Sequence, residues 1–400
     1  IEPPQILASS SNEIAWVKAS PSDTVEVFVV ESNPPYTAGE GKRFVGSAVA
    51  DANGLAAVTL MGVSGGTKLT ATTTDVLGNT SQFAQNRTVA DYDCNSTPPS
   101  PALTAERNDD QVVLDWPSVS DATGYHVYRT TDPQTPLTAA HLYAVVTTSS
   151  FTDYEAFEEG SEAYYTVRTT ACGQESADSN WLATYQLVVK SGWNLLAWPI
   201  VPLQTELDMA VGDQLRGTNS PQTADRIMTW NPVSRSYQSY WYCGGACADW
   251  GQPWANHWLA GYNPSTAVIR TDQGFWVQNR ASFEQTIMVI GTVANSTRSQ
   301  TIQSGWNLLG YSSADDKTLA QLNLPMTGTN DPTTSNQIIY WDAAGQQYQT
   351  AWFCACPTWG EAYHNKWLTL DFTASPIMIK SGTGFWYLNR TNGVFSWQLP

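Results

Sequence analysis

The chain has 400 residues, of which 42% are hydrophobic, 12% aromatic and 14% charged, and its formal net charge is −17. This length exceeds what one hydrophobic core serves and predicts two to four domains. A nucleic-acid-binding protein needs a basic surface to displace counterions, so the acidic charge excludes that class and also disfavours anionic membrane surfaces.

The chain opens with IEPPQILASS, which lacks both a Met and a basic n-region, and we interpret the sequence as a processed or excised chain. No apolar run is long enough to span a membrane, so we expect no membrane insertion. Thr, Val and aromatic residues suit pleated, half-buried surfaces and are typical of β-rich extracellular proteins. We therefore expect an all-β protein located outside the cell or on its surface.

Residues 1–92 form the first predicted domain. TVEVFVV (24–30) and KLTATTTD (68–75) alternate with a period of two, and the turn signals DANG and GVSGG separate the strands. The order of VEVFVV, ADANG and TATTTDVLGNTS resembles bacterial Ig-like modules of large secreted surface proteins. The resemblance implies a β-sandwich that serves as a spacer or display element.

Residues 93–183 form the second predicted domain, after a Pro- and Ser-rich linker that stiffens the joint. VVLDWPSVSDATGYHVYRT (112–130) and AYYTVRTTACGQESADSN (163–180) resemble a fibronectin type III domain. The resemblance implies that Trp116 fills the core between two sheets of a sandwich.

Residues 184–296 and 297–400 are predicted to be two homologous Trp-rich β repeats with a few short helices. KSGWNLLAW (190–198) returns as QSGWNLLGY (303–311), and the later DQGFWVQNR returns as GTGFWYLNR. Both motifs predict buried strands that follow a Gly turn. Such GWNL and GFW units resemble segments near the C-termini of secreted bacterial and archaeal surface proteins, which implies extracellular β structure.

Helices are expected at two places in this half of the chain, ELDMAVGDQL (206–215) and TLAQLNL (318–324). Every other motif of the repeat predicts strands and turns.

An aromatic frame, W-G-x-x-[W/Y]-x-N-x-W, occurs once in each repeat, as WGQPWANHW (250–258) and WGEAYHNKW (359–367). Indole rings beside Asn could stack on sugars, so the candidate ligand-binding residues are Trp250, Trp254, Asn256, Trp258, Trp359, Tyr363, Asn365 and Trp367. The competing interpretation is core packing. A spacing of four would place the rings on one helical stripe, which is usually buried, and Gly and Asn are turn residues. Packing is therefore favoured over binding.

Six cysteines are expected to be oxidised: Cys94, Cys172, Cys243, Cys247, Cys354 and Cys356. A pairing of Cys94 with Cys172 would staple the second domain and stabilise it by roughly 4 kcal/mol. The other four could close one small loop per repeat, and pairing between the repeats is left open. A zinc site with His257 or His364 is the weaker alternative, because the Cys354–Cys356 spacing is too short.

Five N-x-S/T sequons give weak support for a glycoprotein with an exterior location: Asn79, Asn86, Asn95, Asn295 and Asn389. The loop DYEAFEEG (153–160) has carboxylates but no EF-hand spacing. We expect no cofactor, with a structural Ca²⁺ ion left open. None of the short catalytic motifs occurs, while paired carboxylates cannot be recognised before the fold is known.

These features predict a non-catalytic extracellular protein of the cell surface, such as a surface-layer protein, a filament subunit or an adhesin stalk. Its expected partners are copies of itself or other surface proteins. The alternative is a carbohydrate-binding accessory region of a secreted hydrolase, in which the aromatic frames contact glycans.

Overall fold

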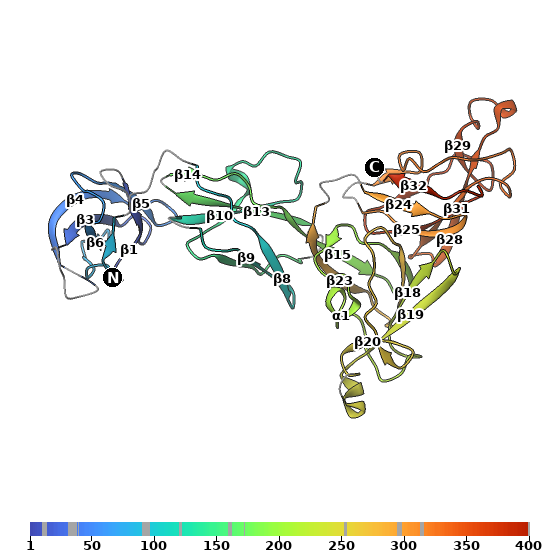
Figure 1. Cartoon of the computed structure of the whole chain (residues 1–400), viewed down its shortest axis with the longest axis horizontal. Coiled ribbons are helices and arrows are strands. Elements are labelled where there is room, and N and C mark those ends of the chain that lie inside the picture. Colours follow the sequence, from blue (N-terminus) through green and yellow to red (C-terminus); the bar gives the residue numbers. More distant parts are fainter. Residues whose placement is uncertain are drawn as a thin grey trace. The chain divides into compact units, whose positions relative to one another are not determined.

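The chain is built almost entirely from antiparallel β-sheets (Figure 1). The computed structural model describes the chain except residues 10–13, 31–37, 39, 90–96, 120–121, 159–161, 172, 252–253, 294–297, 313–315 and 399–400. The expected fold class, tandem β-sandwiches and further β domains with few short helices, is confirmed. Within this part of the chain, no helix is long and apolar enough to cross a membrane.

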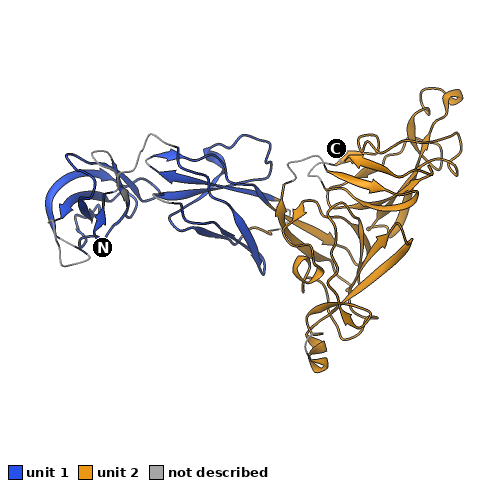
Figure 2. Ribbon diagram, viewed as in Figure 1, with its two compact units in different colours: residues 1–154, 163–182 blue, residues 155–162, 183–400 orange. Residues whose placement is uncertain are grey.

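The chain consists of two compact units (Figure 2). Unit 1 holds residues 1–154 and 163–182, and unit 2 holds residues 155–162 and 183–400.

The first part of unit 1 is a sandwich of two sheets. One sheet has the order β1 (Gln5–Ser9), β2 (Ile14–Lys18), β5 (Leu55–Thr59), and the other β4 (Gly41–Val49), β3 (Thr24–Val30), β6 (Lys68–Thr74), β7 (Arg87–Thr88). Alternate residues of β2 and β3 point inward, so Val and Ala side chains of both sheets form one core. The period of two in the sequence therefore arises because every second side chain of these strands points to the inner face of the sandwich.

A second sandwich completes unit 1. Its sheets are β12 (Ser150–Asp153), β9 (Gln111–Asp115), β8 (Thr104–Asn108) and β11 (Leu142–Val146), β10 (Gly124–Thr130), β13 (Ala163–Ala171), β14 (Gln174–Glu175), beside the 3₁₀ turn η1 (Ala139–His141). Trp116 is 4% exposed and meets Tyr125 edge to face at 5.2 Å. The predicted core position of Trp116 is therefore correct.

In unit 2, the equivalent strands of the two Trp-rich repeats take the same order. Repeat 1 has β16 (Gly192–Leu196), β22 (Phe275–Asn279), β18 (Arg226–Asn231), β19 (Ser236–Cys243), β20 (His257–Ala260) and β21 (Asn263–Pro264). Repeat 2 has β25 (Gly305–Gly310), β31 (Gly384–Asn389), β27 (Gln337–Asp342), β28 (Gln347–Cys354) and β29 (Lys366–Thr369). The GWNLL and GFW motifs are buried strands, as predicted.

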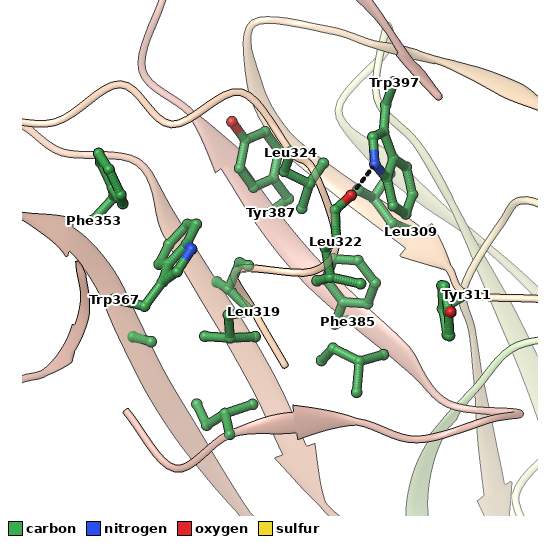
Figure 3. Packing of buried hydrophobic residues seen from close by; sticks show 14 of the residues in the cluster. Leu309, Tyr311, Leu319, Leu322, Leu324, Phe353, Trp367, Phe385, Tyr387 and Trp397 are labelled. Carbon is green, nitrogen blue, oxygen red and sulfur yellow. Dashed lines mark hydrogen bonds between the residues drawn. The ribbon is translucent and has the colours of Figure 1, made fainter. Parts of the chain in front are cut away.

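Further strands lie outside these two sheets. In repeat 1, β15 (Leu182–Val189), β23 (Gln285–Thr292) and β17 (Val201–Pro202) are neighbours in one sheet, and in repeat 2 β24 (Ser299–Ile302) pairs with β32 (Phe395–Gln398) and β26 (Lys317–Thr318) with β30 (Met378–Ile379). In repeat 2 they enclose a core in which the Trp397 indole N–H donates to the Leu322 carbonyl at 2.6 Å, between Phe385 and Leu309 (Figure 3).

The helix predictions for this half are largely wrong. Only α1 (Leu207–Ala210) forms within 206–215, and residues 318–324 are the end of β26 followed by turns. Short 3₁₀ turns, η2 (Gly245–Trp250) and η3 (Pro357–Trp359), occur elsewhere. Apolar residues at these positions fit a helical period, but they pack into the core from turns, because tertiary contacts outweigh a weak local propensity.

The two repeats join along a seam in which a set of backbone contacts occurs twice with the partners exchanged. Four backbone contacts cross it: bridges of Leu196 with Thr383 and of Leu309 with Gln273, and hydrogen bonds of 2.9 Å from Ala197 N–H to the Gly382 carbonyl and from Gly310 N–H to the Asp272 carbonyl. Each pair consists of the same two repeat positions. An approximate two-fold axis therefore relates the repeats, as in an isologous dimer interface.

Candidate binding site

The first ring of each aromatic frame lies at the surface. Trp250 ends η2 and Trp359 ends η3, and each is followed by a Gly with φ above +80°. Trp250 is 39% exposed and Trp359 is 36% exposed. The W-G dipeptide therefore turns the chain and leaves the indole at the outer end of its repeat.

Each of these indoles belongs to a small exposed aromatic group, which we call a tip. In repeat 1, Trp250 lies 6.1 Å from exposed Tyr262, and both contact buried Trp241. In repeat 2, Trp359 lies 5.7 Å from exposed Phe372, and both contact buried Trp352. The chain therefore presents two equivalent tips.

The last ring of each frame is core. Trp258 lies in β20, is fully buried and donates its indole N–H to the Gly212 carbonyl at 3.0 Å. Trp367 lies in β29 and packs on Phe353 within the core of repeat 2. The predicted helical stripe is wrong, because the three positions of a frame occupy a 3₁₀ turn, a second turn and a strand, which face different ways.

The middle ring of the frame is partly buried in repeat 1 and exposed in repeat 2. Trp254 is partly buried against the cluster around Trp241 and donates to the Tyr262 carbonyl at 3.0 Å. Its counterpart Tyr363 is 37% exposed and meets Trp359 edge to face. The frame residues thus do not form one platform, and of the six frame aromatics only Trp250, Trp359 and Tyr363 are exposed.

The two frame asparagines shape the backbone. Asn256 and Asn365 have φ of 61° and 57°, and their N–H groups donate to the carbonyls of Cys243 and Cys354 at 2.7 and 2.8 Å. A left-handed conformation is one that Asn tolerates better than most residues. Their interpretation as turn residues therefore holds in the structure.

Disulfides close the loop that precedes each frame. Cys243 pairs with Cys247 and Cys354 pairs with Cys356, with Cα–Cα distances of 5.9 and 5.2 Å. Pairing is thus within each repeat, and His257 contacts Asp208 at 2.7 Å instead of joining these sulfurs. Cys94 and Cys172 lie outside the described residues.

The sequons differ in accessibility. Asn79 is exposed and Asn86 is half-buried, whereas Asn95 and Asn295 lie outside the described residues. Asn389 is 1% exposed, and its amide donates to the carbonyls of Gln303 and Gly393. A glycan at Asn389 is therefore incompatible with this fold, since its amide nitrogen is already enclosed by the repeat.

A second aromatic surface lies along the seam, and we call it the seam groove. It consists of two adjoining pockets with volumes of about 290 and 220 Å³. Their lining residues are Trp230, Tyr237, Trp306, Ile339, Tyr348 and Trp386 in one pocket, and Trp341, Tyr348, Trp193, Met228, Tyr237 and Trp276 in the other. The two lists are given in matching order. Each residue in the first list therefore occupies the same position in its repeat as the residue at the same place in the second list.

Two hydrogen bonds, which the approximate two-fold axis relates to each other, fix the indole side chains of the seam groove. Trp230 donates its indole N–H to the Trp306 carbonyl at 3.1 Å, and its counterpart Trp341 donates to the Trp193 carbonyl at 2.7 Å. Trp193 also accepts from the Gln346 side-chain amide at 2.9 Å. Each repeat therefore holds the aromatic strand of the other in place.

Sequence reasoning missed the seam groove. The signal was present in RIMTWN and QIIYWD, where Ile227 and Met228, and likewise Ile338 and Ile339, are consecutive apolar residues of one strand. Consecutive apolar residues in a strand indicate that both faces are covered. Ile227 and Ile338 face the two cores, and Met228 and Ile339 face the seam.

The lining of the seam groove carries no charged side chain. Burial raises the pKa of Tyr237, against a smaller opposing effect of a hydrogen bond with Trp276, and burial raises the pKa of Tyr348. Both phenols therefore stay neutral at physiological pH and remain able to donate.

A polar cleft of about 460 Å³ lies beside the same seam and shares Trp230 with it. Its charged members Arg270 and Asp272 pair with each other at 3.0 Å. The described part of the chain contains no group of three or more His, Cys, Asp or Glu side chains placed to hold a metal ion.

Two buried carboxylates of the described residues accept hydrogen bonds that stabilise the fold. Asp153, at the start of the acidic loop, accepts hydrogen bonds from Tyr165 at 2.6 Å and Tyr143 at 3.0 Å. Asp225 accepts from the backbone N–H groups of Arg216 and Arg280 at 2.8 and 2.7 Å.

A charged cluster lies on the second sandwich. Glu175 accepts from Arg168 at 2.8 Å and from Tyr128 at 2.9 Å, and it also contacts His126. Burial raises the pKa of Glu175, but the hydrogen bonds with Arg168, His126 and Tyr128 together lower it below its usual value. This cluster ties β14 to β10 and β13.

Comparison with known proteins gives no family for the chain: no family model and no curated protein matches it. Among solved structures, the chain is similar to an Fn3-like protein from Clostridium thermocellum, with 28% identity, 22% of this chain and 90% of that chain covered, and a TM-score of 0.19. It is also similar to the FN1-FN3 domains of chicken CNTN1, with 11% identity, 73% and 98% covered, and a TM-score of 0.20. Likenesses at these TM-scores carry no argument about function.

Proposed function

We propose that this chain is a non-catalytic extracellular protein of the cell surface. Its tandem sandwiches act as spacers, and its two Trp-rich repeats form one rigid head. The observation that carries the proposal is the symmetric seam, which joins the repeats by paired backbone contacts and indole hydrogen bonds.

The use of the acidic side chains supports a structural role. The buried carboxylates Asp23, Asp153 and Asp225 accept hydrogen bonds from Thr73, from tyrosines and from backbone N–H groups. A glycosidase instead needs two carboxyl groups about 5 to 9 Å apart, facing a sugar. The seam groove, whose lining is mostly aromatic, has no carboxylate in it.

Assembly is the test of the surface role. The purified chain is sedimented over a range of concentrations and imaged by negative stain, with and without Ca²⁺. We expect ordered oligomers or filaments at high concentration, since exposed sheet edges can pair between copies. Particles that remain monomeric under all these conditions would refute a role as a self-assembling subunit.

The exposed tips favour a second candidate function, glycan binding by Trp250 and Trp359. A glycan array tests it with the W250A/W359A double variant, and Tyr262→Ala provides a second perturbation of the tip in repeat 1. Loss of binding by a folded variant supports this function. Unchanged binding would refute it.

A further inference from the structure

The seam groove is distinct from the tips and has a different construction. Its two pockets are related by the approximate two-fold axis, and both include Tyr237 and Tyr348. These two side chains are 44% and 57% exposed, whereas Trp276 and Trp386 below them are 4% and 9% exposed. The groove therefore has a rigid indole floor and an open tyrosine rim.

Neighbouring rings hold the side chains of the seam groove in place. Tyr348 meets Trp341 edge to face at 4.7 Å, and Tyr237 meets Trp230 in the same way at 5.0 Å. Trp386 lies 5.2 Å from Trp230 across the seam. Since edge-to-face contacts hold each ring from its side, the groove is preorganised, which lowers the entropic cost of binding.

Hydroxyl groups continue the rim along the strands. Ser239 follows Tyr237 by two positions on β19 and is exposed, and Thr350 follows Tyr348 by two positions on β28. Side chains two residues apart in a strand share a face. The rim of each half is therefore a phenol and an aliphatic hydroxyl, each able to donate and to accept.

We propose that the seam groove binds a neutral polysaccharide, with one sugar ring over each of its two pockets. Two equivalent pockets side by side suit a ligand that repeats along its length. The uncharged lining suits a neutral chain, and flat indoles with neighbouring hydroxyls suit pyranose rings, whose faces are apolar and whose edges are polar.

A proline-rich peptide is the occupant that fits less well. Such a peptide offers backbone carbonyls and needs N–H donors from the groove. The indole N–H groups of Trp230 and Trp341, on the floor of the groove, are engaged by backbone carbonyls across the seam and are not free to bind a peptide carbonyl. An enclosed small molecule is equally disfavoured, since the rim tyrosines leave the groove open.

Polysaccharide binding in the seam groove requires neither self-assembly of the chain nor glycan binding at the tips. The probes are soluble neutral polysaccharides, namely hydroxyethyl cellulose, mixed-linkage β-glucan, galactomannan and dextran, with a poly-L-proline peptide as comparison. Binding to the full chain is measured by affinity electrophoresis and by the change in Trp fluorescence. We expect at least one of the four polysaccharides to bind, and the peptide to bind more weakly or not at all.

The decisive variant is Y237A/Y348A, which removes only exposed rings and leaves the indole floor intact. It should weaken binding of the polysaccharide by roughly tenfold or more while the variant remains folded, as judged by cooperative urea unfolding. Y237F/Y348F keeps both rings and should retain most of the binding. The tip variant W250A/W359A is the matched control and should bind the same polysaccharide as the unaltered chain.

Several results would overturn the proposal. They are binding of none of the four polysaccharides, tighter binding of poly-L-proline, or full binding by folded Y237A/Y348A. Loss of binding in W250A/W359A with full binding by Y237A/Y348A would move the glycan site to the tips. If Y237A/Y348A does not fold, the single variants Y237A and Y348A take its place, and full binding by both folded single variants would refute the role of the rim.

Discussion

Gly274 and Gly384 are equivalent positions that face each other across the seam, and Ala at either one should wedge the repeats apart. A Cβ atom on Gly274 would lie 2.6 Å from the Leu309 carbonyl oxygen, and one on Gly384 would lie 2.7 Å from the Leu196 carbonyl oxygen. Each glycine also has the other's Cα within 3.3 Å of that position. The obstacles are backbone atoms, so rotation of a side chain cannot relieve the contact.

The expected cost follows from these contacts. Overpacking typically costs about 1–3 kcal/mol, and separation of the repeats would also weaken a flanking hydrogen bond such as Ala197 N–H to Gly382, worth about 1 kcal/mol. Each single variant should therefore lose about 2–4 kcal/mol. The double variant should lose less than the sum, because one displacement relieves both contacts.

Urea unfolding followed by Trp fluorescence measures this loss, because 15 of the 18 tryptophans lie in residues 184–400. With a slope of about 2–3 kcal/mol per molar, the midpoint should fall by about 1 M. Gly393→Ala is the matched control, since its Cβ would meet nothing closer than Thr391 Oγ1 at 3.8 Å. If G274A and G384A both unfold at the midpoint of the unaltered chain, the seam does not hold the repeats together as described.

Three further predictions concern single side chains. Trp258→Ala should destabilise unit 2 by about 3–5 kcal/mol because it empties the core, while Trp250→Ala should cost under about 1 kcal/mol because the ring is at the surface; equal urea midpoints would contradict this assignment. Trp230→Phe should cost about 1 kcal/mol more stability than Trp341→Phe. When Trp341 is changed, the Trp193 carbonyl still accepts a hydrogen bond from the Gln346 amide, whereas no described side chain besides Trp230 donates to the Trp306 carbonyl. The reverse order of stabilities would contradict this prediction. Glu175→Gln should destabilise the second sandwich by about 1 kcal/mol at pH 7. Because the pKa of Glu175 is lower in the folded chain than in the unfolded chain, its contribution is present above the unfolded pKa and is lost as the pH falls through the folded pKa. An unchanged pH dependence of stability in the variant, measured by urea unfolding with far-ultraviolet circular dichroism, would argue against this role.

Much of the local structure was predictable because its causes are local. Alternating residues predicted the strand β3, and Trp116 was recognisable as core from the motif around it. The W-G dipeptides and the frame asparagines indicated turns, and Asn256 adopts the left-handed backbone. In each case a few neighbouring residues supply the decisive conformational preference.

The helical stripe failed for the opposite reason. A spacing of four relates Trp250 to Trp258 only if the backbone between them is helical. The chain instead leaves η2 at Gly251 and enters β20, which sends one ring to solvent and the other into the core. The spacing alone could not distinguish a tip from a core position.

By itself, the sequence determined the class of the fold, the sandwich and repeat segments, the buried GWNLL and GFW strands and the turns between them, because each depends on residues close together in the chain. Only the tertiary structure decided which indoles fill a core, which reach the surface and which line the seam groove. Trp230 meets the carbonyl of Trp306, and Trp341 meets that of Trp193, at sequence separations of 76 and 148 residues. Such contacts form only when two complete sheets dock about a common axis, and no local pattern specifies that docking.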